Sequence, residues 1–321
     1  MANYLVTGGG GFIGSHLVEH LTGQGEAVRV LDDFSTGHRA NLEAVRGRFE
    51  LIEGDLRDPE ACGRAVKDID YVLHQGAIPS VPRSVAEPIE TSQVNVMGTI
   101  TLLEAARRAD VRRVVYAASS SAYGDQQAPA KREDLLARPL SPYAAAKLSG
   151  EHFCRAYAAS MGLEVVCLRY FNVFGPRQDP NSPYSAVIPL FVTAAIDGRR
   201  PTIYGDGRQT RDFTYVENTV RGNLLAATTD QPVSGRVINL ACGDSFSLLD
   251  LLEVIGEAMG RRIDPVFEPP RAGDVRHSLA DIELARKLLD YRVTVDFKTG
   301  IRRTIEWFMK HPSAWGASST V

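Results

Sequence analysis

The sequence predicts an α/β protein in which helices cover both faces of a doubly wound parallel sheet. Short apolar runs, typical of buried strands, alternate with longer amphipathic segments over the first 170 residues. A glycine-rich turn separates the first run from the first helix, and the second run ends on acidic residues. After Asn172 this alternation gives way to clusters of Pro, Gly and Asn, which indicate a second, smaller α/β domain.

The composition is that of a soluble globular protein. The 321 residues carry a formal net charge of −3, so we expect neither nucleic acid nor a membrane surface as a partner. No basic segment followed by a long apolar one stands at the start, so we expect no signal peptide, no spanning helix and a cytoplasmic location. The cysteines form no C-x-x-C pair, and we interpret them as reduced thiols.

The first predicted elements are a strand over residues 4–7, a glycine turn and a helix over residues 12–21. Gly8, Gly11 and Gly14 allow the backbone to turn tightly and to approach a pyrophosphate at the helix N-terminus. Glycines alone would indicate only a tight turn. Their position between a strand and a helix predicts a dinucleotide site.

The second predicted strand, residues 27–32, ends on Asp32, about 20 residues after the glycines. Its carboxylate can accept hydrogen bonds from the adenosine ribose hydroxyls and would repel a 2′-phosphate, so the sequence favours NAD over NADP. Arg29 and Arg39 are near enough in sequence to leave NADP open.

The alternation continues with strands at 49–53, 71–74, 114–118 and 163–170 and with helices at 58–66 and 95–108. Ligands of such sheets bind at the carboxyl ends of the strands. We therefore expect Asp55, residues 75–77 and residues 119–121 to face one crevice.

A helix is predicted to begin after Ser141, a good N-cap residue, with Pro142 in its first position. Tyr143 and Lys147 are four residues apart and share one face of it. A nearby ammonium favours the phenolate, so Lys147 is expected to lower the pKa of Tyr143 from about 10 towards neutrality. This pair indicates proton transfer by a tyrosine.

The segment from His16 to His20 spells H-x-x-E-H, a pattern of zinc proteases. It lies on the helix that follows the glycine turn, where His16, Glu19 and His20 can form a polar face. The sequence therefore predicts no metal site.

Loop-rich segments at 174–181 and 204–208 precede a further predicted sheet strand at 237–240. We therefore expect the chain to leave the first domain and to return to it. The predicted first domain comprises residues 1–170 with a return segment at about 212–244, and the substrate domain comprises residues 171–211 and 245–321.

From Thr7 to about Trp307 the sequence resembles the extended short-chain dehydrogenases/reductases, and within them the nucleotide-sugar 4-epimerases, such as the UDP-glucose and UDP-N-acetylglucosamine (UDP-GlcNAc) 4-epimerases. The motifs that carry this resemblance are Thr7–Gly14, Asp55-Leu56, Ser119 ahead of Tyr123-Gly124, Tyr143-x-x-x-Lys147, Leu168–Asn172, Gly207-x-x-x-Arg211-Asp212-Phe213 and Gly273-Asp274-Val275. The resemblance implies a Rossmann domain that retains NAD through a full catalytic cycle.

In the implied mechanism Tyr143 takes the proton of the sugar 4-hydroxyl while C4 gives a hydride to NAD. The 4-keto sugar then turns over and receives the hydride on its other face. Lys147 holds the nicotinamide ribose. Ser119 supplies the active-site hydroxyl, with Ser121 as second choice.

The resemblance also implies two sets of binding residues. For the cofactor they are Gly8, Gly11, Phe12, Ile13, Gly14, Asp32, Asp33, Gly37, Asp55, Leu56, Gln75, Gly76, Ala77, Asn95, Lys147 and Tyr170. For the UDP-sugar they are Val81, Ser119, Tyr143, Asn172, Val187, Tyr204, Arg211, Arg271, Asp274 and Ser278.

The sequence departs from the pattern of its relatives at two places, and both departures narrow the expected reaction. Related dehydratases and decarboxylases place an acidic residue just after the active-site hydroxyl, whereas residues 120–122 are Ser, Ser and Ala, which favours epimerisation. Ser278 stands where some relatives carry a bulky tyrosine, which leaves room for an N-acetyl group. We therefore expect conversion of UDP-GlcNAc and UDP-GalNAc, with UDP-glucose and UDP-galactose also open.

Three alternatives remain at this stage. UDP-glucuronate epimerisation would need a partner for the carboxylate, for which Arg83 or Arg177 is available in the sequence. A decarboxylase or dehydratase is disfavoured by the missing acid. A regulator that binds NAD without catalysis would not need Tyr143, Lys147 and Ser119 together.

The resemblance also implies a homodimer that pairs the helices near 95–108 and 141–161.

Overall fold

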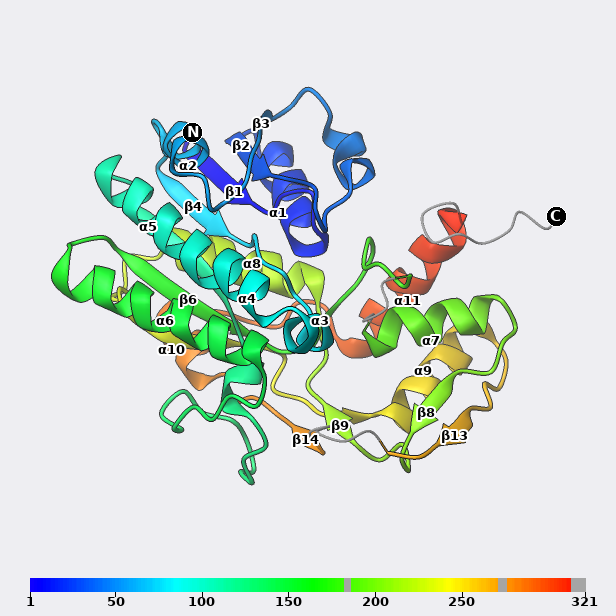
Figure 1. Cartoon of the computed structure of the whole chain (residues 1–321). Coiled ribbons are helices and arrows are strands. Elements are labelled where there is room, and N and C mark those ends of the chain that lie inside the picture. Colours follow the sequence, from blue (N-terminus) through cyan, green and yellow to red (C-terminus); the bar gives the residue numbers. More distant parts are fainter. Residues whose placement is uncertain (182–185, 271–275, 313–321) are drawn as a thin grey trace.

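The computed structural model describes residues 1–181, 186–270 and 276–312, and its centre is a seven-stranded parallel sheet (Figure 1). The strands follow the order β11-β6-β5-β4-β1-β2-β3. Their bounds are Asn3–Thr7 (β1), Ala27–Asp32 (β2), Glu50–Glu53 (β3), Tyr71–His74 (β4), Arg113–Ser119 (β5), Val165–Tyr170 (β6) and Val237–Leu240 (β11). The order runs outward in both directions from β1 and β4, so their carboxyl ends form the switch point at which such sheets bind ligands. The predicted doubly wound sheet is confirmed.

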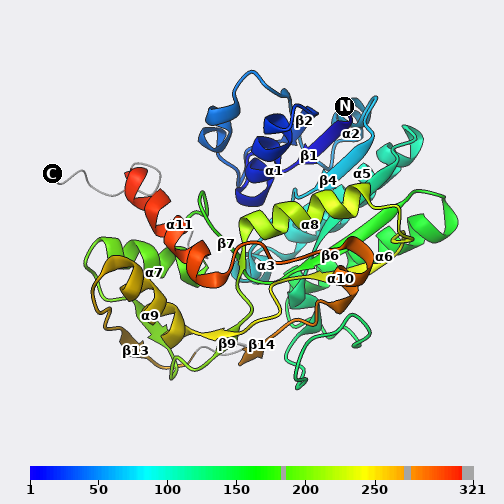
Figure 2. The same ribbon diagram turned by 180° about the vertical axis from the view of Figure 1, so that it is seen from behind.

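Helices cover both faces of this sheet, as Figures 1 and 2 show from opposite sides. One face packs against α1 and α8, and the other against α2, α5 and α6. The bounds are Phe12–Gly23 (α1), Pro59–Val66 (α2), Thr99–Arg108 (α5), Pro142–Ser160 (α6) and Val216–Thr228 (α8). Each face is therefore a separate apolar core, and the central strands between them are buried, whereas the edge strand β3 is largely exposed.

The turn from β1 into α1 requires glycine for two reasons. Gly8 has a φ of 67°, a region that L side chains rarely adopt, and a Cβ there would lie 2.7 Å from Cα of Gly76. A Cβ on Gly14 would lie 2.0 Å from the carbonyl oxygen of Gly8. The first turn of α1 is thus pressed against the strand ends.

A smaller lobe packs beside the carboxyl edge of the sheet (Figure 1). Its core is a cluster of aromatic rings that includes Phe174, Phe213, Phe246 and Phe297. The helices that surround it are Val187–Ile196 (α7), Leu248–Met259 (α9) and Phe297–Lys310 (α11). The short strands are Val173–Phe174 (β7), Thr202–Tyr204 (β8), Thr210–Arg211 (β9), Thr214–Tyr215 (β10), Phe246–Ser247 (β12), Val266–Glu268 (β13) and His277–Ser278 (β14).

The carboxylate of Asp212 joins three segments where the two lobes meet. It accepts hydrogen bonds from the N–H groups of Cys242 and Gly243, both at 2.9 Å, and of Ala280 at 3.3 Å. Helix α10 (Glu283–Leu289) follows Ala280 and packs on the sheet with β11. The sequence predicted that all of residues 245–321 belong to the substrate domain. Residues 280–291 instead contribute to the core of the sheet, because Ile282, Ala285 and Leu289 are buried there.

Two short helices and a wide turn differ from the sequence prediction. The chain forms α3 (Val81–Ala86) and α4 (Pro88–Ser92), which are too short to show a helical period. The predicted helix 95–108 begins instead as a π-helix over Gln93–Gly98 and continues as α5. In this turn the Asn95 side chain points inward and bonds the backbone of Ile78. Among the described residues, no helix has both the length and the apolar character needed to cross a bilayer.

Asp212 should make folding stability fall as the pH rises. Burial raises its pKa from 3.8 to about 7, so its contribution is fully present below pH 3.8 and is lost as the pH rises through 7. Relative to Asp212→Asn, the free energy of unfolding of the wild type should fall between pH 4 and 8, by up to about 4 kcal/mol. Denaturant titrations at several pH values measure this difference. Asp230→Asn, at an exposed carboxylate, should keep the wild-type pH dependence; the same slope in Asp212→Asn would contradict the assignment.

Candidate active site

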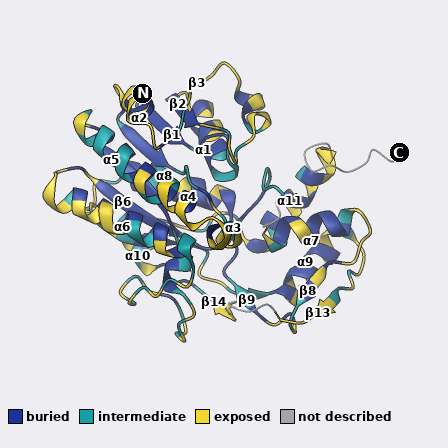
Figure 3. Ribbon diagram, in the orientation of Figure 1, coloured by how far each residue is buried: buried dark blue, intermediate teal, exposed yellow. Residues whose placement is uncertain are grey.

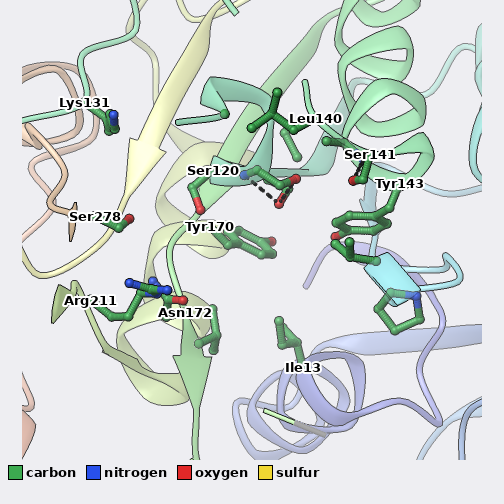
Figure 4. Close-up of a pocket in the computed structure, with 18 of the residues that line it drawn as sticks. Ile13, Ser120, Lys131, Leu140, Ser141, Tyr143, Tyr170, Asn172, Arg211 and Ser278 are labelled. Atoms are coloured by element: carbon green, nitrogen blue, oxygen red, sulfur yellow. Dashed lines mark hydrogen bonds between the residues drawn. The ribbon is translucent and has the colours of Figure 1, made fainter. Parts of the chain in front are cut away.

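A cavity of about 540 Å³ opens at the carboxyl ends of β5 and β6, between the sheet and the smaller lobe (Figure 4). Figure 4 shows Tyr143 and Ser141 on one side of it and Arg211 and Ser278 on the other. Ten of the predicted site residues line it: Phe12, Ile13, Val81, Ser119, Ser121, Tyr143, Tyr170, Asn172, Arg211 and Ser278. The volume is in the range of small-molecule sites.

Tyr143 stands in the first turn of α6. Ser141 caps this helix, with its hydroxyl accepting from the N–H of Ala144 at 3.2 Å, and Pro142 occupies the first helical position, as predicted. The N–H of Tyr143 donates to the hydroxyl of Ser84 on α3 at 3.0 Å. Helix α6 therefore begins at a fixed place beside the cavity.

Lys147 lies one turn further along α6 and is 4% exposed. Its ammonium donates to the carbonyl of Ala117 at 2.9 Å and lies 5.1 Å from the centre of the Tyr116 ring. Burial lowers the pKa of Lys147 to about 8. This lysine is buried and is not among the residues that line the cavity.

The electrostatics of Tyr143 differ from the sequence prediction. Burial raises the pKa of this phenol above 10, and a hydrogen bond with Ser119 lowers it in part. The prediction that Lys147 lowers the pKa of Tyr143 towards neutrality is therefore wrong. Desolvation dominates, and the hydroxyl of Ser119 is the group that favours the phenolate.

Ser119 is the last residue of β5, and residues 120–123 form a 3₁₀ turn. The Ser119 hydroxyl accepts from the hydroxyl of Ser121 at 2.8 Å and from its N–H at 3.2 Å. Ser121 thus supports Ser119, which contacts Tyr143. All three serines face the cavity, as the strand end predicted.

The glycine turn at the mouth of α1 fits a dinucleotide. Gly11 occupies the N-cap position and has no side chain with which to cap the first-turn N–H groups. Asp32 is buried beside this turn, where its carboxylate accepts from the N–H of Gly10 at 2.7 Å and from that of Phe34 at 2.8 Å. A Cβ on Gly37 would lie 2.8 Å from the carbonyl carbon of Gly10, so the following loop also closes on this turn.

The other predicted cofactor residues are distributed around this turn and the ends of β3 and β4. Asp55 is bonded to Arg57, which lowers the pKa of that carboxyl, and the exposed Asp33 bonds Ser35. Leu56 packs against Gly76, and Ala77 follows it.

Two amides near these strand ends already have partners in the protein. The Gln75 amide donates to the Tyr170 hydroxyl and to Asn223, both at 3.1 Å. Both polar groups of the Asn95 amide bond the backbone of Ile78.

On the substrate side, β9 and β14 pair so that Arg211 and Ser278 are neighbours in register. Asn172, with a φ of 35°, donates to the carbonyl of Asp212 at 3.2 Å. Val187 begins α7 and Tyr204 ends β8, and neither lines the cavity. Two further predicted residues, Arg271 and Asp274, lie outside the described residues.

The H-x-x-E-H segment has a structural role that sequence reasoning missed. The Arg177 guanidinium contacts Nδ1 of His16 at 2.9 Å, pairs with Glu19 and donates to the carbonyl of Asn41 at 3.1 Å. Nε2 of His16 bonds the carbonyl of Pro176 at 2.9 Å, and burial lowers the pKa of His16 to about 3. No cluster with metal-ligand composition exists among the described residues.

Further residues that line the cavity were not predicted as site residues from the sequence. They are Pro79, Ala118, Ser120, Gly124, Lys131, Leu140, Ser141, Ala144, Val173 and Gln178. Lys131 is an example, since it is buried and its backbone bonds Leu279 and Asp281 across the molecule. Four of them, Ser120, Gly124, Ser141 and Ala144, lie within or beside motifs that the sequence had already marked.

Comparisons with known proteins identify the family of this chain. A model of the NAD dependent epimerase/dehydratase family matches residues 4–241. The UDP-glucose 4-epimerase of Mycolicibacterium smegmatis is 38% identical over 95% of this chain and 97% of its own length. A relative named UDP-N-acetyl-alpha-D-glucosaminuronate decarboxylase, from Bacillus cytotoxicus, is 32% identical over 95% of this chain and 97% of its own.

Two solved structures extend the comparison to the fold. The UDP-N-acetylglucosamine 4-epimerase from Methanobrevibacter ruminantium M1, in complex with UDP-N-acetylmuramic acid, has a TM-score of 0.92 and 40% identity over 97% of this chain and 99% of its own. The UDP-glucuronic acid 4-epimerase from Bacillus cereus, in complex with UDP-glucuronic acid and NAD, has a TM-score of 0.89 and 34% identity over 96% and 99%. The chain therefore belongs to the NAD-dependent epimerase/dehydratase family, a family of extended short-chain dehydrogenases/reductases.

Proposed function

We propose that this enzyme inverts C4 of a UDP-hexose through a transient 4-keto sugar. The observation that carries the proposal is that Tyr143, Ser119 and Arg211 line one cavity. No Asp or Glu lines this cavity among the residues that the structure describes. Elimination and decarboxylation use an additional acid or base, so the lining supports epimerisation over the reactions of the dehydratase and decarboxylase relatives.

Each residue then has a defined task. Tyr143 takes the proton of the 4-hydroxyl and returns it to the opposite face of the sugar after the keto intermediate has turned. Ser119 donates a hydrogen bond to the same oxygen and holds it beside the phenol. NAD supplies the redox chemistry, since it accepts a hydride from C4 and gives it back. Arg211 binds the diphosphate of UDP, which stays anchored while the sugar rotates.

We infer that the glycine turn, the Asp32 carboxylate and Lys147 hold the cofactor. The first-turn N–H groups of α1 suit the pyrophosphate, and Asp32 accepts from the adenosine ribose. The smaller lobe, with residues 171–211 and much of 245–321, holds the UDP group in this proposal.

The preferred sugar is proposed to carry an N-acetyl group. Ser278 is small, lines the cavity and pairs with the strand of Arg211, so the wall at this point leaves room for a bulky substituent. Glucuronate is less well supported, since both guanidiniums that could meet its carboxylate have partners. Arg83 is bonded to Glu87 and Glu90, and Arg177 binds α1.

We also propose a cytoplasmic homodimer. Large apolar side chains are exposed together on α3, α4, the π-helix and α6, whose outer sides carry many exposed residues in Figure 3. They are Val85 (64% exposed), Ile89 (73%), Met97 (54%) and Phe153 (39%). A second copy of this chain, with the same patch, is the occupant that would bury these side chains on both partners at once.

Replacing Tyr143 with Phe should abolish turnover while leaving NAD bound. The variant keeps the ring and loses only the hydroxyl, so kcat for UDP-sugar conversion should fall by about 10²–10⁴-fold. Chromatography of the nucleotide released on denaturation measures the bound NAD. Tyr157→Phe, on the same helix but at the Glu104 contact, is the matched control and should keep full activity. Full activity in Tyr143→Phe would overturn the mechanism.

Replacing Ser278 with Tyr should separate the sugars. The added ring fills the space beside Arg211, so conversion of UDP-GlcNAc should fall by about tenfold or more while that of UDP-glucose is largely kept. Product analysis with each UDP-sugar, without added NAD, measures both. His277→Tyr, on the same strand but exposed, is the control. If the wild type converts UDP-glucose and leaves saturating UDP-GlcNAc unchanged, the pocket argument fails.

Replacing Ile89 with Asp should dissociate the proposed dimer, because a charge would be buried without a partner. Size-exclusion chromatography with light scattering should give a dimer for the wild type and a monomer for the variant. Leu249→Asp, at an exposed position on α9, should remain dimeric. A monomeric wild type, or a variant that stays dimeric, would contradict this interface.

A further inference from the structure

We infer that Ser84 is a positioning residue that fixes Tyr143 against Ser119 and thereby sets the rate of proton transfer. The inference deepens the proposed function and rests on it. Ser84 lies on α3, outside the cavity lining, and nothing in the family motifs marks it. Its hydroxyl is the link between α3 and the first turn of the catalytic helix.

The first N–H groups of a helix have no partner within the helix and must find one elsewhere. In α6 the Ser141 hydroxyl accepts from the N–H of Ala144, which leaves the N–H of Tyr143 without a local acceptor. The Ser84 hydroxyl accepts this bond at 3.0 Å. Tyr143 is therefore held through its own backbone by a different segment of the chain.

The orientation of the Ser84 hydroxyl is determined by its second bond. It donates to the carbonyl of Val81 at 2.6 Å, so its lone pairs face the N–H of Tyr143. Ser84 is fully buried, and water does not compete for either bond. A buried hydroxyl that both donates and accepts admits little displacement of either partner.

The segment that carries Ser84 is itself fixed to the sheet side of the molecule. Asn95 binds both backbone groups of Ile78, at 2.8 and 3.0 Å. Ser80 then caps α3 by accepting from the N–H of Arg83 at 3.1 Å. Hydrogen bonds, together with the short chain segment from Ile78 to Ser80, thus connect Asn95 through α3 to Tyr143.

Two residues of this connection, Val81 and Tyr143, line the cavity. A shift of the first turn of α6 would move the Tyr143 phenol relative to the Ser119 hydroxyl on the same cavity wall. The interaction with Ser119 lowers the pKa of Tyr143 against the effect of burial, so weakening it raises the pKa further. Catalytic groups displaced by about 1 Å can lose as much as 10²-fold in rate.

A helix cap alone would affect stability, whereas a positioning role also affects catalysis. Loss of a cap lowers the free energy of unfolding and leaves the pH profile of kcat unchanged. Loss of positioning lowers kcat more than it changes KM and moves the acidic limb of the profile to higher pH. One set of variants can therefore distinguish a purely structural role from a positioning role.

The test uses the full-length protein with Ser84→Ala, Ser84→Thr and Ser92→Ala. Ser92 is the matched control, since its hydroxyl also bonds a carbonyl within its own helix, at 2.8 Å, but makes no hydrogen bond to α6. For Ser84→Ala we expect kcat to fall by about tenfold or more at pH 7 with KM within about twofold. Ser84→Thr, which keeps the hydroxyl, should recover most of kcat, and Ser92→Ala should match the wild type.

A measurement without substrate separates this inference from the proposed function. NMR of ¹³C-labelled tyrosine reports the titration of Tyr143, identified by its absence in Tyr143→Phe, and its pKa should be higher in Ser84→Ala. A wild type that converts no UDP-sugar would refute the proposed function and leave this pKa shift as the readout of the inference. An unchanged pKa of Tyr143 together with unchanged kcat in Ser84→Ala would overturn the inference, as would equal losses in Ser92→Ala.

Discussion

The contact between Gly8, Gly14 and Gly76 is the constraint on which the rest of the site depends. A Cβ on Gly14 would lie 2.0 Å from the Gly8 carbonyl oxygen, and one on Gly8 2.7 Å from Gly76. The first turn of α1 can therefore approach the ends of β1 and β4 only where no side chains stand between them. This approach aims the helix N-terminus across the switch point of the sheet, towards the same edge at which β5 delivers Ser119.

The site itself combines rigid supports from several segments. The sheet places Ser119 at a strand end, a cap and a proline start the helix of Tyr143, and the smaller lobe brings Arg211 and Ser278 across the cavity. Burial raises the pKa of the phenol and lowers that of the neighbouring ammonium. Both effects favour the uncharged forms, so charge that develops on the substrate oxygen meets a dry and preorganised environment.

The structure could be predicted from the sequence wherever a local rule determines it. The strand of residues 27–32, the start of α6 and the polar strand ends follow from apolar periodicity, capping residues and parallel topology. Contacts between distant segments carried no such signal. The bond from Tyr143 to α3, the buried Lys131 and the return of residues 280–291 to the sheet each depend on tertiary packing. The pKa of Tyr143 was mispredicted because spacing along a helix does not reveal burial.

The His16, Glu19 and Arg177 cluster ties α1 to the loop after β7. Residues of the cofactor helix and of the substrate loop thus share one set of hydrogen bonds, although 158 positions separate Glu19 from Arg177. Substitutions at these places are coupled rather than independent, and their energetic effects do not add. A change at Glu19, half-exposed on the outside of α1, therefore also affects the loop that carries Arg177. Sequence divergence on this helix and on that loop is therefore expected to occur in pairs.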